Sequence, residues 1–254
     1  MRGAHGHIGS CFPTGRHYPG IADRIAASIQ SVEGLCDELG AGRRWLEVPL
    51  VVIDFETTGT DSERDRVIEI GLVGFDEGQC SFSEGFLVDP GIPIPEESRA
   101  IHGITDEELA GAPRFVEVLP RLLELLAGRL PVAYNASFDR NFLHAELARV
   151  AGTLSTDAPL PPALRSEVVW VDPLVWAREI LKELKSRKLV DVAAHLEVPL
   201  EQAHRATGDA EATGYVLLAL APRMPTIYGE LIRLQGRYSA FQEAEFARFR
   251  AMRG

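Results

Sequence analysis

The amino-acid sequence predicts an α/β fold, in which a mixed five-stranded sheet carries helices on both faces. Three β-branched, apolar runs follow one another with short polar links, at residues 48–55, 66–75 and 81–88. This is the pattern of an antiparallel meander. After them, helical periodicity alternates with two further short apolar runs, at 131–134 and 168–172. Such alternation is typical of helices that cover a sheet.

Helices are expected between and after these strands. A capping box formed by Thr105 and Glu108 would start a short helix that ends at Gly111. Ser137 is expected to cap the helix after the fourth strand, and Pro173 stands in the first turn of the next one. The helices of this region are expected at 105–111, 115–126, 137–150, 173–184, 189–196 and 209–220.

The domain organisation follows from length and composition. The chain has 254 residues, which suits one α/β domain, here expected at 48–221, with extensions at both ends. Residues 1–20 are expected to form a flexible tail, and 21–47 a helical extension with an amphipathic helix at 21–39. Residues 222–254 are expected to form a basic helical extension that is interrupted at its central glycine. It could dock a partner or pack on the domain, and packing is the favoured interpretation.

Bulk composition argues against several classes of protein. The chain is 46% hydrophobic and 25% charged, and its net charge of −11 does not mark it as a nucleic-acid binder. Its three cysteines form no C-x-x-C pair, which fits reduced thiols in a cytoplasmic protein. The N-terminus lacks the apolar core of a secretory signal, and no apolar run approaches the ~18 residues of a membrane span.

Two carboxylates, Asp54 and Glu56, stand at the end of the first strand, just before a Thr-Thr-Gly turn signal. Because residues i and i+2 of a strand point to the same face, the two side chains should project together, with Phe55 turned into the core. Neighbouring carboxylates repel each other unless a cation or a proton lies between them. The pair therefore predicts a divalent metal site.

Two later segments offer carboxylates to the same site. Asp139 follows the fourth strand and should lie in the first turn of a helix, next to the positive end of the helix dipole. Asp209 should also lie in a first helical turn, and His204 precedes it on the approaching loop. Each segment alone is explained at least as well by ordinary helix capping, so these residues by themselves leave the assignment open.

Taken in order, the segments resemble the motifs of the DEDDh (DnaQ-like) 3′→5′ exonucleases, which include the epsilon-type proofreading nucleases of DNA polymerase III. The resemblance covers about residues 50–221. It implies a ribonuclease H-like three-layer fold and 3′→5′ exonuclease activity with two divalent metal ions, Mg²⁺ or Mn²⁺. The motifs are Asp54-Phe-Glu56-Thr-Thr-Gly, Ile101-His-Gly-Ile-Thr105, Asn135-Ala-Ser-Phe-Asp139 and His204-Arg-Ala-Thr-Gly-Asp209-Ala.

The resemblance also implies roles for single residues. Asp54, Glu56 and Asp209 would hold the metal that bears the attacking water. Asp54 would also touch the second metal, which Asp139 would help to bind. His204 would be the general base on that water, a role that suits an imidazole because an unperturbed histidine titrates at about 6.5. Phosphodiester hydrolysis accumulates negative charge, which two hard cations held by carboxylates would stabilise.

Three further residues are candidates for contact with the substrate. Thr57 and His102 resemble family positions that touch the terminal nucleotide, and Phe138 could lie beside it. The alternatives are a turn role for Thr57 and core packing for Phe138. The basic segment 178–188 could follow a nucleic-acid backbone or form a solvated helix face.

The expected function is therefore a metal-dependent exonuclease that trims the 3′ end of single-stranded nucleic acid, DNA rather than RNA, during replication or repair. A polymerase or another replication protein could be its partner, and no membrane is expected. Two alternatives stay open. One is an RNA-trimming exonuclease of the same fold, because the motifs do not report on the 2′-hydroxyl. The other is a non-catalytic replication adaptor, against which the complete set of four acids and one histidine argues.

Overall fold

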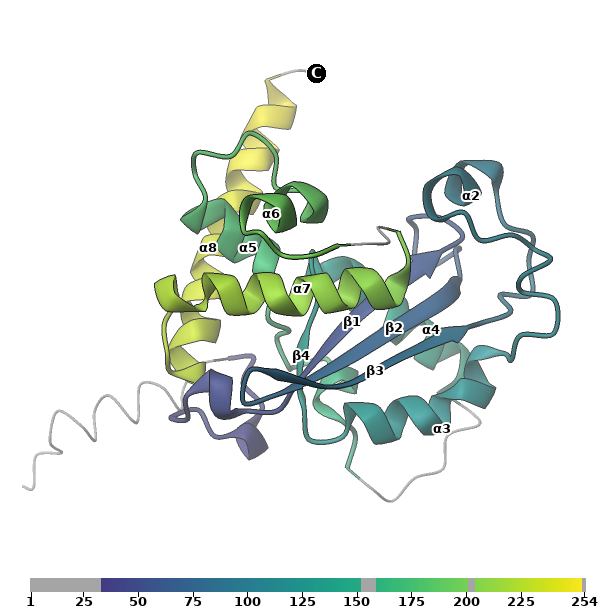
Figure 1. Cartoon of the computed structure of the whole chain (residues 1–254), viewed down its shortest axis with the longest axis horizontal. Coiled ribbons are helices and arrows are strands. Elements are labelled where there is room, and N and C mark those ends of the chain that lie inside the picture. The colour runs from purple at the N-terminus through teal and green to yellow at the C-terminus, as the bar shows by residue number, and fades with distance from the viewer. Residues whose placement is uncertain (1–32, 152–158, 201–203, 253–254) are drawn as a thin grey trace, which may run out of the picture.

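The computed structural model describes residues 33–151, 159–200 and 204–252. Within them the chain forms a four-stranded sheet with helices on both faces (Figure 1). The first three strands form the expected antiparallel meander, and the fourth pairs in parallel with the first. In spatial order the strands are β3 (Gln79–Leu87), β2 (Val67–Asp76), β1 (Leu50–Thr57) and β4 (Leu130–Val132).

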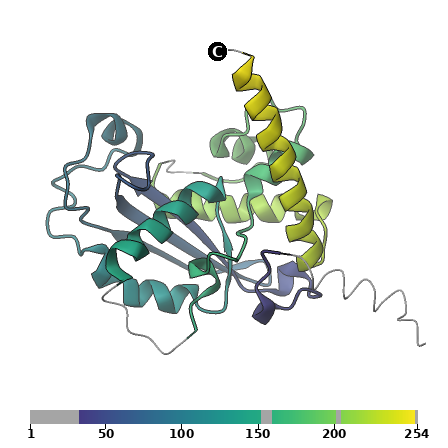
Figure 2. The ribbon, with the colours of Figure 1, turned by 180° about the vertical axis from the view of Figure 1, so that it is seen from behind.

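The helices form a layer on each side of the sheet. α7 lies across one face, α5 and α6 pack against α7, and α8 packs against α5, while α3 and α4 cover the other face (Figures 1 and 2). The helices of the described ranges are α2 (Glu96–His102), α3 (Phe115–Leu126), α4 (Ala136–Val150), α5 (Pro173–Ile180), α6 (Leu189–His195), α7 (Ala206–Leu220) and α8 (Tyr228–Ala251).

The prediction of a fifth strand is wrong for the described residues. The segment 168–172 makes one isolated parallel bridge to β4. In this bridge the N–H of Val171 donates to the carbonyl of Pro131 at 2.9 Å, and its carbonyl accepts from the N–H of Ala133 at 3.1 Å. The side chain of Gln235 in α8 bonds the opposite edge of the segment, where it accepts from the N–H of Asp172 at 2.9 Å and donates to the carbonyl of Trp170 at 2.8 Å. A longer ladder with β4 does not form, because the N–H of Val169 donates to the carbonyl of Gly34 at 2.8 Å and Pro173, which has no N–H, already begins α5.

Three helix predictions are also corrected. The capping-box hydrogen bonds between Thr105 and Glu108 form, at 2.9 and 3.3 Å, but they close a turn rather than a helix. α5 ends at Ile180, short of its expected end. α8 runs through Gly236 without a break, because one glycine costs a long helix only about 1 kcal/mol. The N-terminal helix falls mostly outside the described residues, and its last part is the single 3-10 turn Asp37–Leu39.

The start of α4 is built by a carboxylate from another segment. Asn135 takes a left-handed conformation (φ 66°), and its N–H and that of Ala136 both donate to the carboxylate of Asp172 at 3.0 Å. The same carboxylate accepts from the N–H of Leu174 at 2.9 Å. Asp172 therefore caps both α4 and α5, and α4 begins before Ser137, the predicted cap.

Side chains of β1 alternate between two cores. The core beneath α7 takes Leu50 and Val52, and the core beneath α3 and α4 takes Val51, Ile53 and Phe55. The same alternation places Asp54 and Glu56 on the α7 face of the sheet. The strand period therefore predicted the direction of both carboxylates and the burial of Phe55 correctly.

The last helix packs on the domain through its first half. Tyr228, Leu231 and Ile232 are buried in the core that α7 shares. Towards the other end of α8, Phe246 and Phe249 are about half exposed, at 48% and 52%. In both ribbon views this end of α8 extends beyond the neighbouring helices (Figures 1 and 2). Among the described residues, no helix is long and apolar enough to cross a membrane.

Candidate active site

The four carboxylates expected at one site are brought together at the C-terminal end of β1. Asp54 and Glu56 come from β1, Asp139 from the first turn of α4 and Asp209 from the first turn of α7. Asp139 Oδ1 accepts a hydrogen bond from the backbone N–H of Phe55 at 3.0 Å. This N–H is available because β4 ends before it and leaves that edge of β1 uncovered.

Burial and mutual repulsion raise the pKa of these carboxyls. The pKa of Asp54 lies well above its usual range, first because of burial and then because of the charges of Asp139, Asp209 and Glu56. Burial, followed by the charge of Asp209, raises the pKa of Glu56 to about 8. Burial also raises the pKa of Asp139 and of Asp209, although backbone N–H groups that donate to them oppose this shift. A group of this kind needs protons or cations between its members.

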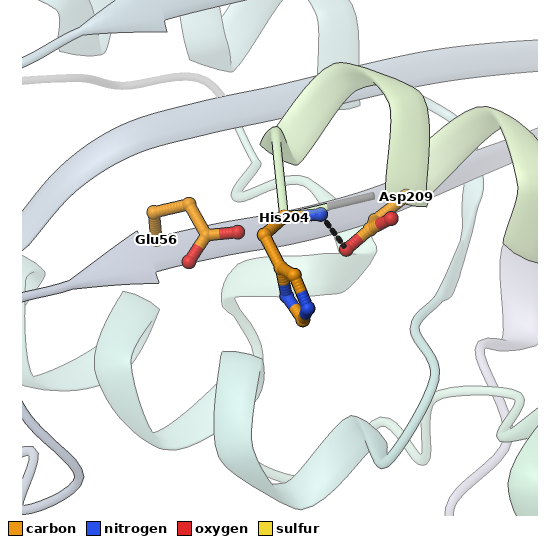
Figure 3. Close-up of side chains that lie close together, drawn as sticks. All are labelled: Glu56, His204 and Asp209. Atoms are coloured by element: carbon orange, nitrogen blue, oxygen red, sulfur yellow. Dashed lines mark hydrogen bonds between the residues drawn. The ribbon is translucent and has the colours of Figure 1, made fainter. Parts of the chain in front are cut away.

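His204 and Asp209 are linked by the backbone that enters α7. His204 takes a left-handed conformation (φ 65°), and its N–H donates to Asp209 Oδ2 at 3.2 Å (Figure 3). The second oxygen of this carboxylate, Oδ1, is buried without a hydrogen-bond partner among the described residues. Glu56 and Asp209 lie on either side of the exposed His204 in Figure 3. One potential ligand atom from each of the three lies within 4.8 Å of the others.

These residues fit a divalent cation such as Mg²⁺ or Mn²⁺. Their donors are carboxylate oxygens and one imidazole, with no thiol, and hard cations prefer oxygen ligands. A cation would offset the repulsion that raises the pKa of Asp54 and Glu56, and it would give the buried Asp209 Oδ1 a partner. The position of His204 is compatible with a metal ligand or with a proton acceptor.

Two residues that the sequence analysis did not single out hold α7 in place. Glu69 of β2 is buried, and its carboxylate accepts from the guanidinium of Arg205 at 2.7 Å and from the N–H of Ala206 at 3.0 Å. These bonds tie the start of α7, and with it His204 and Asp209, to the middle of the sheet. The sequence did offer a signal for this role of Glu69, which is a lone acid among the apolar residues of its strand. Buried acids are rare unless they are paired, so such a residue indicates a partner elsewhere in the fold.

A pair of glycines allows α7 to approach the sheet closely. Gly71 of β2 pairs with Gly85 of β3 on one side and with Asp54 of β1 on the other. A β-carbon on Gly71 would lie 2.2 Å from the carbonyl oxygen of Ala206, and one on Gly85 would lie 2.5 Å from Thr207 Oγ1. Both distances are far below van der Waals contact. At Gly71 the clash is with backbone atoms, so α7 can begin here only over a residue without a β-carbon, whereas a rotation of the Thr207 side chain would relieve the clash at Gly85.

We expect Gly71→Ala to reduce activity while the protein still folds. The added methyl group meets backbone atoms, so α7 must shift and carry Asp209 with it. Overpacking costs about 1–3 kcal/mol in the free energy of unfolding, and a misplacement of about 1 Å at reacting groups costs about 10²-fold in rate. The Tm and the nuclease rate measure both effects.

The control for this substitution is Gly236→Ala, where a β-carbon meets nothing within 4 Å outside its own helix. This variant should keep the wild-type rate and gain about 0.5–1 kcal/mol of stability, because alanine is the better helix former. A Gly71→Ala protein with the rate of wild type would contradict the close approach of α7.

The structure distinguishes the three candidates for substrate contact. Thr57 is buried, and its hydroxyl donates to a backbone carbonyl in the turn after β1 at 2.6 Å. Phe138 packs at the edge of the core, with its ring centroid 4.8 Å from that of Phe142. His102 is buried, and its Nδ1 accepts from the N–H of Ile104 at 3.0 Å. Its Nε2 has no partner within the described part of the chain, so His102 keeps an unused polar atom.

The fold is an α/β architecture of the ribonuclease H-like kind, which solved exonuclease structures share. The family model described as Exonuclease (RNase_T) matches residues 51–217. The chain belongs to this family and, within it, to the DEDDh (DnaQ-like) 3′→5′ exonucleases. It is 36% identical over 167 residues to the PolC-type DNA polymerase III of Clostridium perfringens, which covers 66% of this chain and 11% of that protein.

A second relative covers more of the chain. The PolC-type DNA polymerase III of Thermotoga maritima is 34% identical over 199 residues, which is 78% of this chain and 14% of that protein. The chain therefore matches a small part, 11% and 14%, of the length of these two relatives. The family match ends at residue 217, so α8 lies beyond it.

Solved exonuclease structures share the fold. Exonuclease X in complex with a 5′ overhanging duplex DNA has a TM-score of 0.57 and 23% identity, over 73% of this chain and 99% of that chain. E. coli exonuclease I in complex with an oligonucleotide has a TM-score of 0.58 and 20% identity, over 69% and 42%. A 3′-exonuclease that recognises a histone mRNA stem-loop has a TM-score of 0.58 and 16% identity, over 71% and 84%.

Proposed function

We propose that this protein is a metal-dependent 3′→5′ exonuclease that removes nucleotides from the 3′ end of single-stranded DNA. The observation that supports it most strongly is the meeting of four carboxylates from β1, α4 and α7, beside the exposed His204. Because the pKa of each of these carboxyls is raised, the cluster is suited to hold cations. Membership of the exonuclease family supports the reaction class.

The roles proposed for the residues follow from this arrangement. Asp54, Glu56 and Asp209 would hold one divalent ion, and Asp54 together with Asp139 a second. When bound, these ions supply positive charge against the negative charge that accumulates on the phosphate during hydrolysis. His204 would accept a proton from the attacking water, since its exposed side chain lies next to Glu56 and Asp209 (Figure 3).

Among the candidates for substrate contact, His102 is favoured. Burial lowers its pKa, which favours the neutral ring. Because Nδ1 already accepts a hydrogen bond, the neutral ring carries its proton on Nε2, a buried donor without a partner among the described residues. We propose that this N–H donates to an oxygen of the terminal nucleotide when the substrate is bound. The hydroxyl of Thr57 is bonded within the turn, and the ring of Phe138 packs against the core. We propose that both residues shape the site and do not contact the nucleotide.

DNA is favoured over RNA because the relatives at 34–36% identity are DNA polymerases, whereas the neighbour that recognises an mRNA is 16% identical. The matching region of each PolC-type relative is a small part of a long polymerase chain. This supports a polymerase as the partner of the present chain.

The test is the trimming of matched DNA and RNA oligonucleotides that are labelled at the 5′ end. With Mg²⁺ or Mn²⁺ we expect a ladder of labelled products that shorten from the 3′ end, and no products in EDTA. Immediate release of a labelled mononucleotide would contradict the direction. A rate on RNA that exceeds the rate on DNA would reassign the substrate, and absence of hydrolysis with every divalent ion would favour a non-catalytic adaptor.

A further inference from the structure

A groove adjoins the site between α5, the segment that follows it and the second half of α8. We call it the α8 groove. It has a volume of about 1100 Å³, and its lining includes Arg178, Lys185, Lys188, His204, Phe246 and Phe249. Because His204 belongs both to this lining and to the active site, the groove and the site are continuous. Its α8 wall lies beyond the region matched by the exonuclease family, so it is a feature of this chain rather than of the family model.

The charge of the α8 groove contrasts with that of the whole protein. The chain carries a net charge of −11, yet four cationic side chains and two carboxylates line the groove. One of these carboxylates, Glu179, is already engaged by Lys182 at 3.6 Å and by the amide of Gln242 at 3.0 Å. Lys185 and Lys188 are exposed and form no ion pair with any other described residue. The groove is therefore a locally cationic surface with free ammonium groups, which suits a polyanion.

Aromatic side chains lie beside these cations. The guanidinium of Arg178 lies 4.9 Å from the centroid of the Phe246 ring. Phe246 and Phe249 are both about half exposed on the α8 wall of the groove. Exposed aromatic rings interleaved with cations are the combination by which proteins hold single strands, since bases stack on the rings while the cations contact phosphates.

We propose that the α8 groove binds the single strand that leads to the active site, with phosphates on Lys185 and Lys188 and bases on Phe246 and Phe249. This inference rests on the proposed function, because the groove ends at the catalytic cluster. The last helix is then a strand-binding wall added to the exonuclease domain. A substrate long enough to enter the groove should bind more tightly than one that fills only the site.

The groove is tested in the full-length protein with two sets of variants. The first is the charge reversal of Lys185→Glu with Lys188→Glu, and its matched control is Arg237→Glu with Arg248→Glu on α8, outside the lining. The second is Phe246→Leu, which removes the ring but keeps apolar volume. Its control is Phe241→Leu, at another exposed phenylalanine of the same helix (60% against 48%) that does not line the groove.

Binding is measured by fluorescence anisotropy in EDTA, with single-stranded DNA and RNA of about 16 nucleotides over a series of salt concentrations. The lysine reversal should weaken binding and reduce the slope of log Kd against log salt by about 1.4, which is about 0.7 for each lost phosphate contact. Phe246→Leu should raise Kd by about 5- to 150-fold, the range measured for the loss of one stacked base, with the salt slope unchanged. Both controls should bind like wild type.

Hydrolysis of the p-nitrophenyl ester of thymidine 5′-monophosphate separates the two proposals, because this substrate is too short to enter the groove. All four variants should cleave it at the rate of wild type. Groove variants that bind the long oligonucleotides as tightly as their controls would overturn the strand-binding role and leave the exonuclease proposal standing. A different outcome is that wild type cleaves neither the ester nor the oligonucleotides, yet the groove variants bind the oligonucleotides more weakly than their controls. The exonuclease proposal then fails, while the strand-binding role of the groove is supported.

Discussion

Asp54→Asn is expected to lower the trimming rate by at least about 10³-fold, the upper end of what one preorganised electrostatic group contributes. Asp54 stands at the centre of the cluster, where the charges of Asp139, Asp209 and Glu56 all act on it. It is the residue proposed to contact both divalent ions. The amide keeps the shape of the side chain but removes its charge, so the loss of rate reports the charge. Glu107→Gln, which neutralises an exposed carboxylate in a turn, should leave the rate unchanged.

Asp54→Asn should lower the rate but raise the stability of the metal-free protein at high pH, because the wild-type cluster is itself destabilising there. The folded-state pKa of Glu56 is about 8, above the value of about 4.3 for an unfolded glutamate. The pKa values of Asp54 and Asp209 are raised in the same direction. Between these pH values the folded state therefore holds more protons than the unfolded state, and its stability falls as the pH rises. In EDTA, the Tm of wild type should drop from pH 5 to pH 8.

Asp54→Asn removes one of the mutually repelling charges, so its Tm in EDTA should fall less over the same pH range and exceed that of wild type at pH 8. Mg²⁺ at about 100 times its Kd should raise the wild-type Tm by roughly 5–10 °C and should raise the Tm of the variant far less. Glu107→Gln should follow wild type in every condition. A variant that loses activity but responds to Mg²⁺ like wild type would remove Asp54 from the metal site.

The parts of the site that the sequence predicted well are those that depend on local geometry. Side-chain direction in a strand follows from its period of two, so Asp54 and Glu56 could be placed on one face without knowledge of the rest of the chain. Asp139 and Asp209 lie in the first turns of α4 and α7, as expected. The roles of these four residues stay predictions until the substitutions are made.

The parts that the sequence did not predict depend on contacts between distant segments. The carbonyl of Gly34 takes the N–H of Val169 that a fifth strand would have used, and the Asp172 carboxylate starts α4 before the local capping signal at Ser137. Likewise, Gly71 looks like an ordinary weak point in a strand, and only the position of α7 shows why a β-carbon is excluded there. Local propensity carries no information about which side chain arrives from another part of the fold.

His204→Asn is expected to lower the trimming rate by about 10²–10⁴-fold, the usual contribution of a general base, while the Tm increase caused by Mg²⁺ is retained. Asparagine is the suitable replacement because the backbone here has φ 65°, a conformation that asparagine tolerates better than alanine does. The N–H that donates to Asp209 Oδ2 should therefore stay in place, so that the substitution tests the imidazole alone. His195→Asn, at an exposed histidine on α6, is the matched control and should keep the full rate.

Two further measurements separate a proton acceptor from a metal ligand, since the ring nitrogen of His204 lies within 4.8 Å of ligand atoms of both Glu56 and Asp209. If the imidazole accepts a proton, added imidazole should restore part of the rate, because the side chain is exposed and leaves an accessible space. If it binds the metal instead, a higher Mg²⁺ concentration should restore the rate and the Mg²⁺ needed for the Tm increase should rise. The carboxylates already provide the hard oxygen donors that Mg²⁺ prefers, so we expect rescue by imidazole and an unchanged metal requirement.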